Sequence, residues 1–78
     1  MYQAFYYDLF DELRAGEMII LMSFGTLRDA FNYARKWRIS QRFYTDADVF
    51  ISYTHGSGSK LLGDLGSVAM EHFADKVQ

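Results

Sequence analysis

The sequence predicts a small α+β domain, a two-layer sandwich in which one main helix packs on an antiparallel sheet. Three observations predict this class. A segment with the apolar period of a helix lies near the middle of the chain, and a pair of strand-length segments lies on either side of it, which gives the order ββαββα. Glycine-containing polar stretches separate the two members of each pair. The chain has 78 residues, enough for one core, so we expect residues 1–78 to form a single domain.

The main helix has both an apolar stripe and a start signal. The stripe follows the spacing i, i+3, i+4, i+7 and i+10, and its members are Leu27, Ala30, Phe31, Ala34 and Trp37. Thr26 is placed to cap the helix, with Asp29 three residues later in a capping-box arrangement. Arg38 would rotate back onto the apolar stripe, so we expect the helix to end near Trp37.

The segment before this helix fits two patterns over residues 2–13. Its apolar residues match a helical stripe, which comprises Tyr2, Phe5, Tyr6, Leu9, Phe10 and Leu13. The same stretch is rich in strand-forming aromatic residues and lacks an N-cap, which favours a strand. Asp11–Glu17 is polar and carries Gly16 where a turn needs a glycine. We therefore favour a hairpin here, with a helix over residues 2–13 as the alternative.

The second strand of this hairpin is predicted over Met18–Phe24. This run is apolar at every position except Ser23, and it is too short to form a helix of its own. Apolar side chains on both sides are typical of a strand that is buried on both faces. We expect the second face of the sheet to be covered by the last helix or by a second copy of the protein. An uncovered face would favour self-association as a two-fold homodimer.

The second half of the chain repeats the pattern of strand, turn, strand. Ile39–Asp46 is a polar connection, and Val49–Thr54 reads as a strand. A glycine- and serine-rich turn, His55–Ser59, leads into a short return strand at Lys60–Leu65. Asp64 or Ser67 can cap a last helix. The residues that this helix places on one face are Val68, Ala69, His72 and Phe73.

Charge and aromatic content point to a binding surface rather than to a general nucleic-acid binder. The net charge is −2, yet five of the eight basic residues lie within fifteen positions, from Arg28 to Arg42. Six tyrosines in so short a chain are more than a small core readily buries, and tyrosine is common at protein interfaces. The predicted partner-binding residues are Arg28, Asn32, Tyr33, Arg35, Lys36, Arg38 and Arg42.

None of the familiar reactive constellations is present in the sequence. There is no cysteine, and His55 and His72 are the only histidines, so no zinc-ligand spacing occurs. Ser57 lies in a flexible glycine-flanked turn, which does not match a nucleophile elbow. Gly56–Lys60 also departs from a phosphate-binding loop, because Ser59 separates the last glycine from the lysine. We expect no enzymatic activity, no metal site and no cofactor.

The expected function is that of a small protein-binding module whose partner presents an acidic surface. As a compact, cysteine-free α+β protein of this length, the chain resembles accessory proteins of phages and mobile elements, including anti-CRISPR-type inhibitors of host defence complexes. Two alternatives remain: a nucleic-acid-binding accessory protein that uses the basic helix flank, and a self-associating structural subunit. No apolar run reaches the roughly 18 residues of a membrane span, and no signal-peptide pattern opens the chain. With no cysteine, these features favour the cytoplasm.

Overall fold

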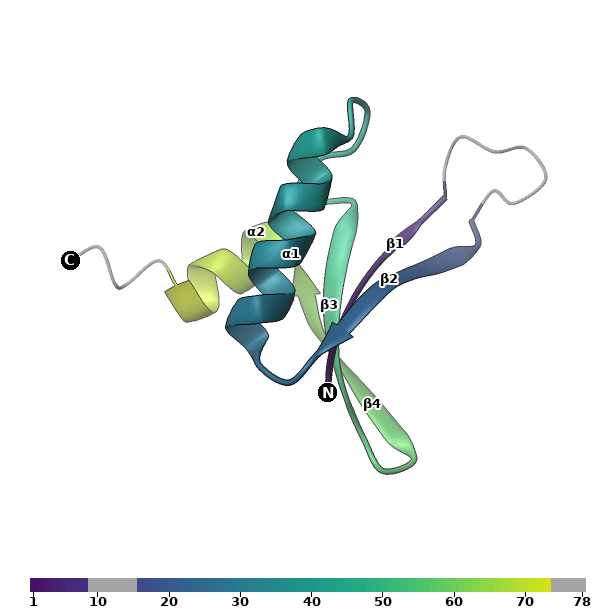
Figure 1. Cartoon of the computed structure of the whole chain (residues 1–78), viewed down its shortest axis with the longest axis vertical. Coiled ribbons are helices and arrows are strands. Elements are labelled where there is room, and N and C mark those ends of the chain that lie inside the picture. The colour runs from purple at the N-terminus through teal and green to yellow at the C-terminus, as the bar shows by residue number, and fades with distance from the viewer. Residues whose placement is uncertain (9–15, 74–78) are drawn as a thin grey trace.

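A computed structural model, in which residues 1–8 and 16–73 are described, confirms the α+β class and the order ββαββα. The strands are β1 (Tyr2–Tyr7), β2 (Met18–Phe24), β3 (Val49–His55) and β4 (Gly58–Asp64). The main helix is α1 (Leu27–Ser40), and a short helix α2 (Leu65–Val68) continues into a π-helical turn η1 (Ala69–Phe73). Figure 1 shows α1 and α2 side by side, on the same side of the sheet. Within the described residues no helix is both long and apolar enough to cross a membrane.

The strand β1 lies in the interior of a four-stranded antiparallel sheet whose order is β2-β1-β3-β4. The favoured strand at the start of the chain is thus confirmed over Tyr2–Tyr7. Met1 and Thr54 exchange two backbone bonds: the Met1 amino group donates to the Thr54 carbonyl at 2.7 Å, and the Thr54 amide donates to the Met1 carbonyl at 2.8 Å. These bonds hold the beginning of β1 against β3.

The hairpin that joins β1 to β2 is closed by two backbone hydrogen bonds. The Asp8 amide donates to the Glu17 carbonyl at 3.0 Å, and the Gly16 amide donates to the Asp8 carbonyl at 2.7 Å. Gly16 has a φ of 80°, a left-handed conformation that favours glycine, as the turn prediction required. The parts of the prediction that concern residues 9–15, including Leu9, Phe10 and Leu13, lie outside the described residues.

The prediction that Met18–Phe24 is buried on both faces is wrong. β2 is an edge strand, and the side chains of Met18, Ile20 and Met22 are 47%, 49% and 49% exposed. The interior position is taken by β1, which pairs with β2 on one side and with β3 on the other. Met18 and Ile20 pair with Tyr7 and Phe5 and point away from the helices, so they remain in solvent, whereas Met22 pairs with the buried Ala4 and lies on the helical side. Met22 stays half-exposed there because an edge strand has a neighbouring strand on one side only.

The core forms between α1, α2 and the helix-facing residues of β1 and β3. Thr26 caps α1 as predicted, since its hydroxyl accepts a hydrogen bond from the Asp29 amide at 3.1 Å. The buried core residues are Ala4, Ala30, Phe31, Ala34, Val49, Ile51, Leu65 and Val68. Three members of the predicted helical stripe are therefore buried, while Leu27 and Trp37 pack against the core half-buried.

The helix α1 does not end at Trp37 but continues to Ser40. Arg38 was expected to interrupt the helix because it returns to the buried side. Its long side chain instead reaches the following loop, where its Nε lies 2.7 Å from Oδ1 of Asp46. The Ser40 hydroxyl donates to the Trp37 carbonyl at 2.6 Å and the Gln41 amide to the Arg38 carbonyl at 3.0 Å, so two carbonyls of the last helical turn have hydrogen-bond partners.

The last helix does not cover the second face of the sheet, which was one of the two expected arrangements. It packs beside α1 instead, with the Phe73 ring 4.8 Å from the Phe31 ring. Of the face predicted for it, Val68 is buried, Ala69 and Phe73 pack against the core, and His72 is exposed. Gly63, near the end of β4, has a φ of 133°, a conformation that favours glycine.

Replacing Phe31 by alanine should lower the free energy of unfolding by about 3–5 kcal/mol, because it leaves a cavity between helix and sheet. Phe31 is 8% exposed and contacts Phe73, so the site has little room to collapse. Urea unfolding followed by circular dichroism measures the loss. Ile39→Ala, at a position 63% exposed, is the control and should stay within about 0.5 kcal/mol of wild type. Equal effects of the two substitutions would contradict the packing described above.

The cap of α2 should make the free energy of unfolding decrease at acidic pH. The Ser67 hydroxyl and the Ser67 amide donate hydrogen bonds to the Asp64 carboxylate, the latter at 2.9 Å, and they lower the pKa of Asp64 from its ordinary 3.8. Because the folded pKa is lowered, this stabilisation is complete above pH about 4 and is lost as the pH falls through the folded value.

Asp64→Asn tests this contribution, since asparagine keeps an oxygen that can cap the helix but does not ionise. Urea unfolding should show the wild type to be more stable than Asp64→Asn at pH 7, with the difference shrinking towards pH 2. A difference that stays constant across this range would mean that the Asp64 charge contributes nothing to the cap.

Candidate functional site

The predicted partner-binding residues form a basic flank along α1 and the loop after it. They lie as follows: Arg28, Asn32, Tyr33, Arg35, Lys36 and Arg38 on the helix, and Arg42 in the loop. Asn32, Arg35, Lys36 and Arg42 are exposed. Tyr33 packs against Phe24, with a ring separation of 5.3 Å, and is 37% exposed.

Two arginines of the basic flank contact other parts of the same chain. The Arg28 guanidinium lies over the Phe73 ring, 4.9 Å from its centre, and Arg38 contacts Asp46. A cation–π contact at an exposed site contributes about 0.5–1 kcal/mol, and a surface ion pair contributes about 0–1 kcal/mol. Part of the positive charge of the flank is therefore used within the fold, and the cations that point freely to solvent belong to Arg35, Lys36 and Arg42.

A second surface, the side of the sheet that faces away from the helices, was not among the predicted site residues. Successive residues of a strand point to opposite faces. Ala4 and Ile51 face the helices, so Phe5 and Phe50 face the other way. We call this surface the open face. It comprises Gln3, Phe5, Tyr7, Met18, Ile20, Phe50, Ser52, Ser59 and Leu61.

Three aromatic rings lie at the centre of the open face. Phe5 and Phe50 are paired across the two inner strands, and their rings stack at 5.6 Å with an angle of 20° between the planes. Tyr7 stands edge-on to both, with ring separations of 5.9 Å from Phe5 and from Phe50. Such offset and edge-to-face contacts are favourable arrangements of aromatic rings. They hold the three side chains in a defined platform.

Beside these rings the open face has a shallow depression of about 240 Å³. Its polar lining consists of Gln3, Ser52 and Ser59, and none of the described residues that line it carries a charge. Pockets for drug-sized ligands usually have about 300–1,000 Å³. This depression is smaller and open, so it suits a single large apolar side chain better than a small-molecule cofactor.

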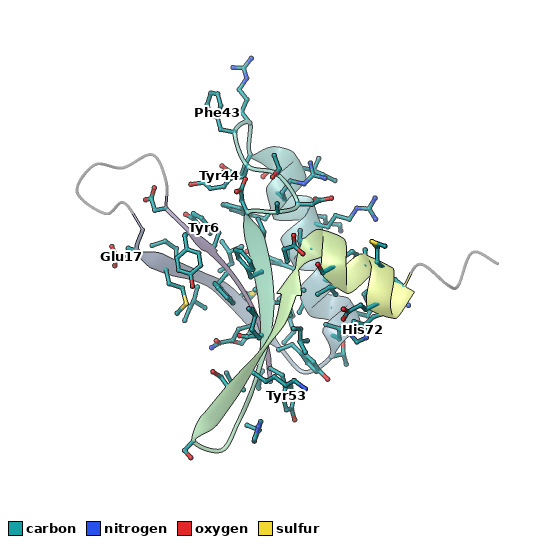
Figure 2. All side chains as sticks on the ribbon, turned by 180° about the vertical axis from the view of Figure 1, so that it is seen from behind. Tyr6, Glu17, Phe43, Tyr44, Tyr53 and His72 are labelled. Atoms are coloured by element: carbon teal, nitrogen blue, oxygen red, sulfur yellow. The ribbon has the colours of Figure 1, made fainter. Side chains whose placement is uncertain are left out.

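The two histidines lie on different elements, at the end of β3 and in η1. The His55 ring stacks at 5.5 Å from the Tyr53 ring, and the Nε2 atom of His72 lies 3.9 Å from a Glu71 carboxylate oxygen. Residues 1–8 and 16–73 contain no group of three or more histidine or acidic side chains that could hold a metal ion. Figure 2 shows His72 on the helical side of the molecule and Tyr53 on the sheet.

The loop after α1 also presents an aromatic side chain. Figure 2 shows Phe43 at the end of the molecule opposite the β3–β4 hairpin, and its side chain is 70% exposed. Its neighbour Tyr44 turns inwards and packs on Tyr6 and Trp37, with ring separations of 5.2 and 5.4 Å. The loop is thus anchored by one aromatic residue and presents the next.

No protein-family model matches the chain, and neither a curated protein nor a solved structure is significantly similar to it.

The contact between Arg28 and Phe73 should be measurable as stability. Arg28→Ala should lower the free energy of unfolding by about 0.5–1 kcal/mol, because it removes the cation from the Phe73 ring. Arg35→Ala, on the same flank of the helix and exposed, is the matched control and should stay within about 0.5 kcal/mol of wild type. Unfolding in urea at low and high salt measures both. If both substitutions lowered the free energy of unfolding by the same amount, the contact of Arg28 with Phe73 would contribute nothing to stability.

Proposed function

We propose that this protein is a protein-binding module that docks its open face on an uncharged apolar patch of a partner protein. In this arrangement one large apolar side chain of the partner fills the depression beside Phe5 and Phe50. The observation that carries the proposal is the uncharged aromatic depression on the face of the sheet that neither α1 nor α2 covers.

The exposure of the open face supports this function. Tyr7, Met18, Ile20 and Leu61 are 40%, 47%, 49% and 58% exposed, and together they surround the nearly buried Phe5. Contiguous apolar patches on a folded surface commonly mark interaction sites. Aromatic residues that are held in place by their neighbours are frequent energetic centres of protein interfaces.

The chemistry of the depression favours an uncharged protein surface over a nucleic acid. Single-stranded nucleic acids also stack on aromatic platforms, but their phosphates require basic side chains nearby. No described residue lining the depression is basic. Four exposed cations, Arg28, Arg35, Lys36 and Arg42, belong to α1 and its following loop. Lys60 of β4 is exposed as well, and it pairs with Tyr53, which shares the helix-facing side of the sheet with Tyr2.

The basic flank then forms a separate and salt-sensitive contact with an acidic surface. It occupies the helical layer, so a flat partner docked on the open face does not reach it. One form of this function is inhibition of a host defence complex, which the length and the cysteine-free α+β composition of the chain suggest. Such a protein acts by occupying a surface of its target, which requires a docking face and no reactive group.

A displayed library of random peptides tests the proposal directly. Panning against the wild-type chain should enrich peptides with an aromatic or large aliphatic anchor and few charges. Leu61→Lys should reduce the binding of these peptides at least tenfold, because it places a charge at the rim of the depression. The matched control is Ile39→Lys, at an equally exposed position on the end of α1, and it should bind as wild type does.

Two other outcomes would overturn the proposal. If the only enriched peptides were acidic ones whose binding is lost in Arg35→Glu/Lys36→Glu and is unchanged in Leu61→Lys, binding would be assigned to the basic flank alone and the open face would have no docking role. Tight, salt-dependent binding of a fluorescent oligonucleotide would assign the protein to the nucleic-acid-binding class. In that case the logarithm of the affinity should fall linearly with the logarithm of the salt concentration, with a slope of about 0.7–0.9 for each neutralised phosphate.

A further inference from the structure

We infer that the partner side chain held in the depression of the open face is a tyrosine, whose hydroxyl forms hydrogen bonds with Gln3 and Ser52. The inference rests on the proposed function and deepens it, because it names the side chain that docks beside Phe5 and Phe50. It gives Gln3 and Ser52 the role of selecting tyrosine over phenylalanine and aliphatic side chains.

The lining of the depression divides into an aromatic pair and a polar pair. Phe5 lies opposite Phe50 across the two inner strands, and Gln3 lies opposite Ser52, two residues further along the same strands. Residues two apart on a strand share one face of the sheet and lie about 7 Å from each other. The two pairs are therefore adjacent steps of one surface, and a side chain in the depression meets both.

The spacing of the two pairs matches the dimensions of a tyrosine side chain. Its hydroxyl stands at the far end of the ring, opposite the attachment to the backbone. When the ring packs against the aromatic pair and points along the strands, the hydroxyl extends towards the polar pair. Half the ring, the hydroxyl and a hydrogen bond of about 2.8 Å together span most of the roughly 7 Å between the pairs. A phenylalanine in the same place brings only carbon atoms to Gln3 and Ser52.

The polar pair has hydrogen-bonding capacity that the fold does not use. Within residues 1–8 and 16–73, the side chains of Gln3 and Ser52 have no hydrogen-bond partner. A docked partner excludes solvent from both, and a buried polar group that is left without a partner costs free energy. An anchor with a hydroxyl replaces the lost hydrogen bonds, whereas a purely apolar anchor does not. Sites of this kind discriminate strongly against the analogue that lacks the hydroxyl.

The chemistry of tyrosine fits both parts of the lining. Its ring can pack against Phe5, Tyr7 and Phe50 in the offset and edge-on geometries that these rings already use among themselves. Its hydroxyl both donates and accepts, as do the Ser52 hydroxyl and the Gln3 side-chain amide. Tyrosine is also uncharged at neutral pH, and none of the described residues that line the depression carries a charge.

Two small compounds test this preference without a partner protein. p-Cresol and toluene differ only by the hydroxyl, as the side chains of tyrosine and phenylalanine do. In a titration of the full chain followed by amide chemical shifts, both should perturb residues 3–7 and 50–52. p-Cresol should bind at least about threefold more tightly, through its hydrogen bonds. Toluene is the more apolar of the two, so burial of apolar area alone would give the opposite order.

The double variant Gln3→Met/Ser52→Ala should lose this preference, because both substitutions remove the polar groups and keep side chains of similar length. The matched control is Ser23→Ala. Ser23 pairs with Gln3 from the other neighbouring strand, and it is not one of the described residues that line the depression. Ser23→Ala should therefore prefer p-cresol as the wild type does. A cooperative unfolding transition in urea shows that each variant is folded.

Equal or tighter binding of toluene to the wild type would overturn the inference. A preference for p-cresol that persists in Gln3→Met/Ser52→Ala would also overturn it, because the hydroxyl would then bind elsewhere. In both cases the proposed function still holds if apolar peptides bind the wild type and lose affinity in Leu61→Lys. If neither compound perturbs the open face at millimolar concentration, the inference fails, and the peptide panning decides separately whether the open face is a docking surface.

Discussion

The placement of both helices on a single face of the sheet is the constraint on which the remaining structure depends. A strand exposes alternate residues to its two faces, so one helical layer divides the strands β1 and β3 into two sets of side chains. The small and branched residues Ala4, Val49 and Ile51 meet the helices and become fully buried. Phe5, Tyr7 and Phe50 are left to form a platform of their own.

This division makes the two sides of the sheet chemically different. The helical side combines a close-packed core with a rim of charged groups, in which Arg28 and Arg38 already contact Phe73 and Asp46. The other side combines aromatic and aliphatic side chains with hydroxyl and amide groups and has no charge in its depression. The two surfaces therefore suit different contacts, one sensitive to salt and the other not.

The elements whose signals are local were predictable from the sequence. The cap at Thr26, the stripe of α1, the turn glycine Gly16 and the cap at Asp64 all depend on neighbours within a few residues. The prediction that β2 is buried on both faces and the predicted end of α1 failed because each depends on a distant residue. The order of strands follows from the pairing of β1 with β3, across about fifty residues of sequence, and Arg38 stays on the helix because Asp46 meets it from the next loop.

The open face was missed for a related reason. Its members come from all four strands, and each looks like an ordinary strand residue in the sequence. The surplus of aromatic residues indicated an interface. The sequence does not show which face of the sheet the helices cover, so the interface could not be assigned to a face. Once α1 and α2 are known to share one face, the alternation along β1 and β3 identifies Phe5, Tyr7 and Phe50 directly.

The position of the single tryptophan has a practical consequence. Trp37 lies half-buried in the helical layer, with its ring 4.4 Å from Tyr6 and 5.4 Å from Tyr44. Its emission consequently reports on the junction of helix, sheet and loop, and it changes when that junction opens. The sheet separates it from the platform of Phe5 and Phe50, so the protein carries an optical probe of its own integrity that is insulated from events on the opposite face.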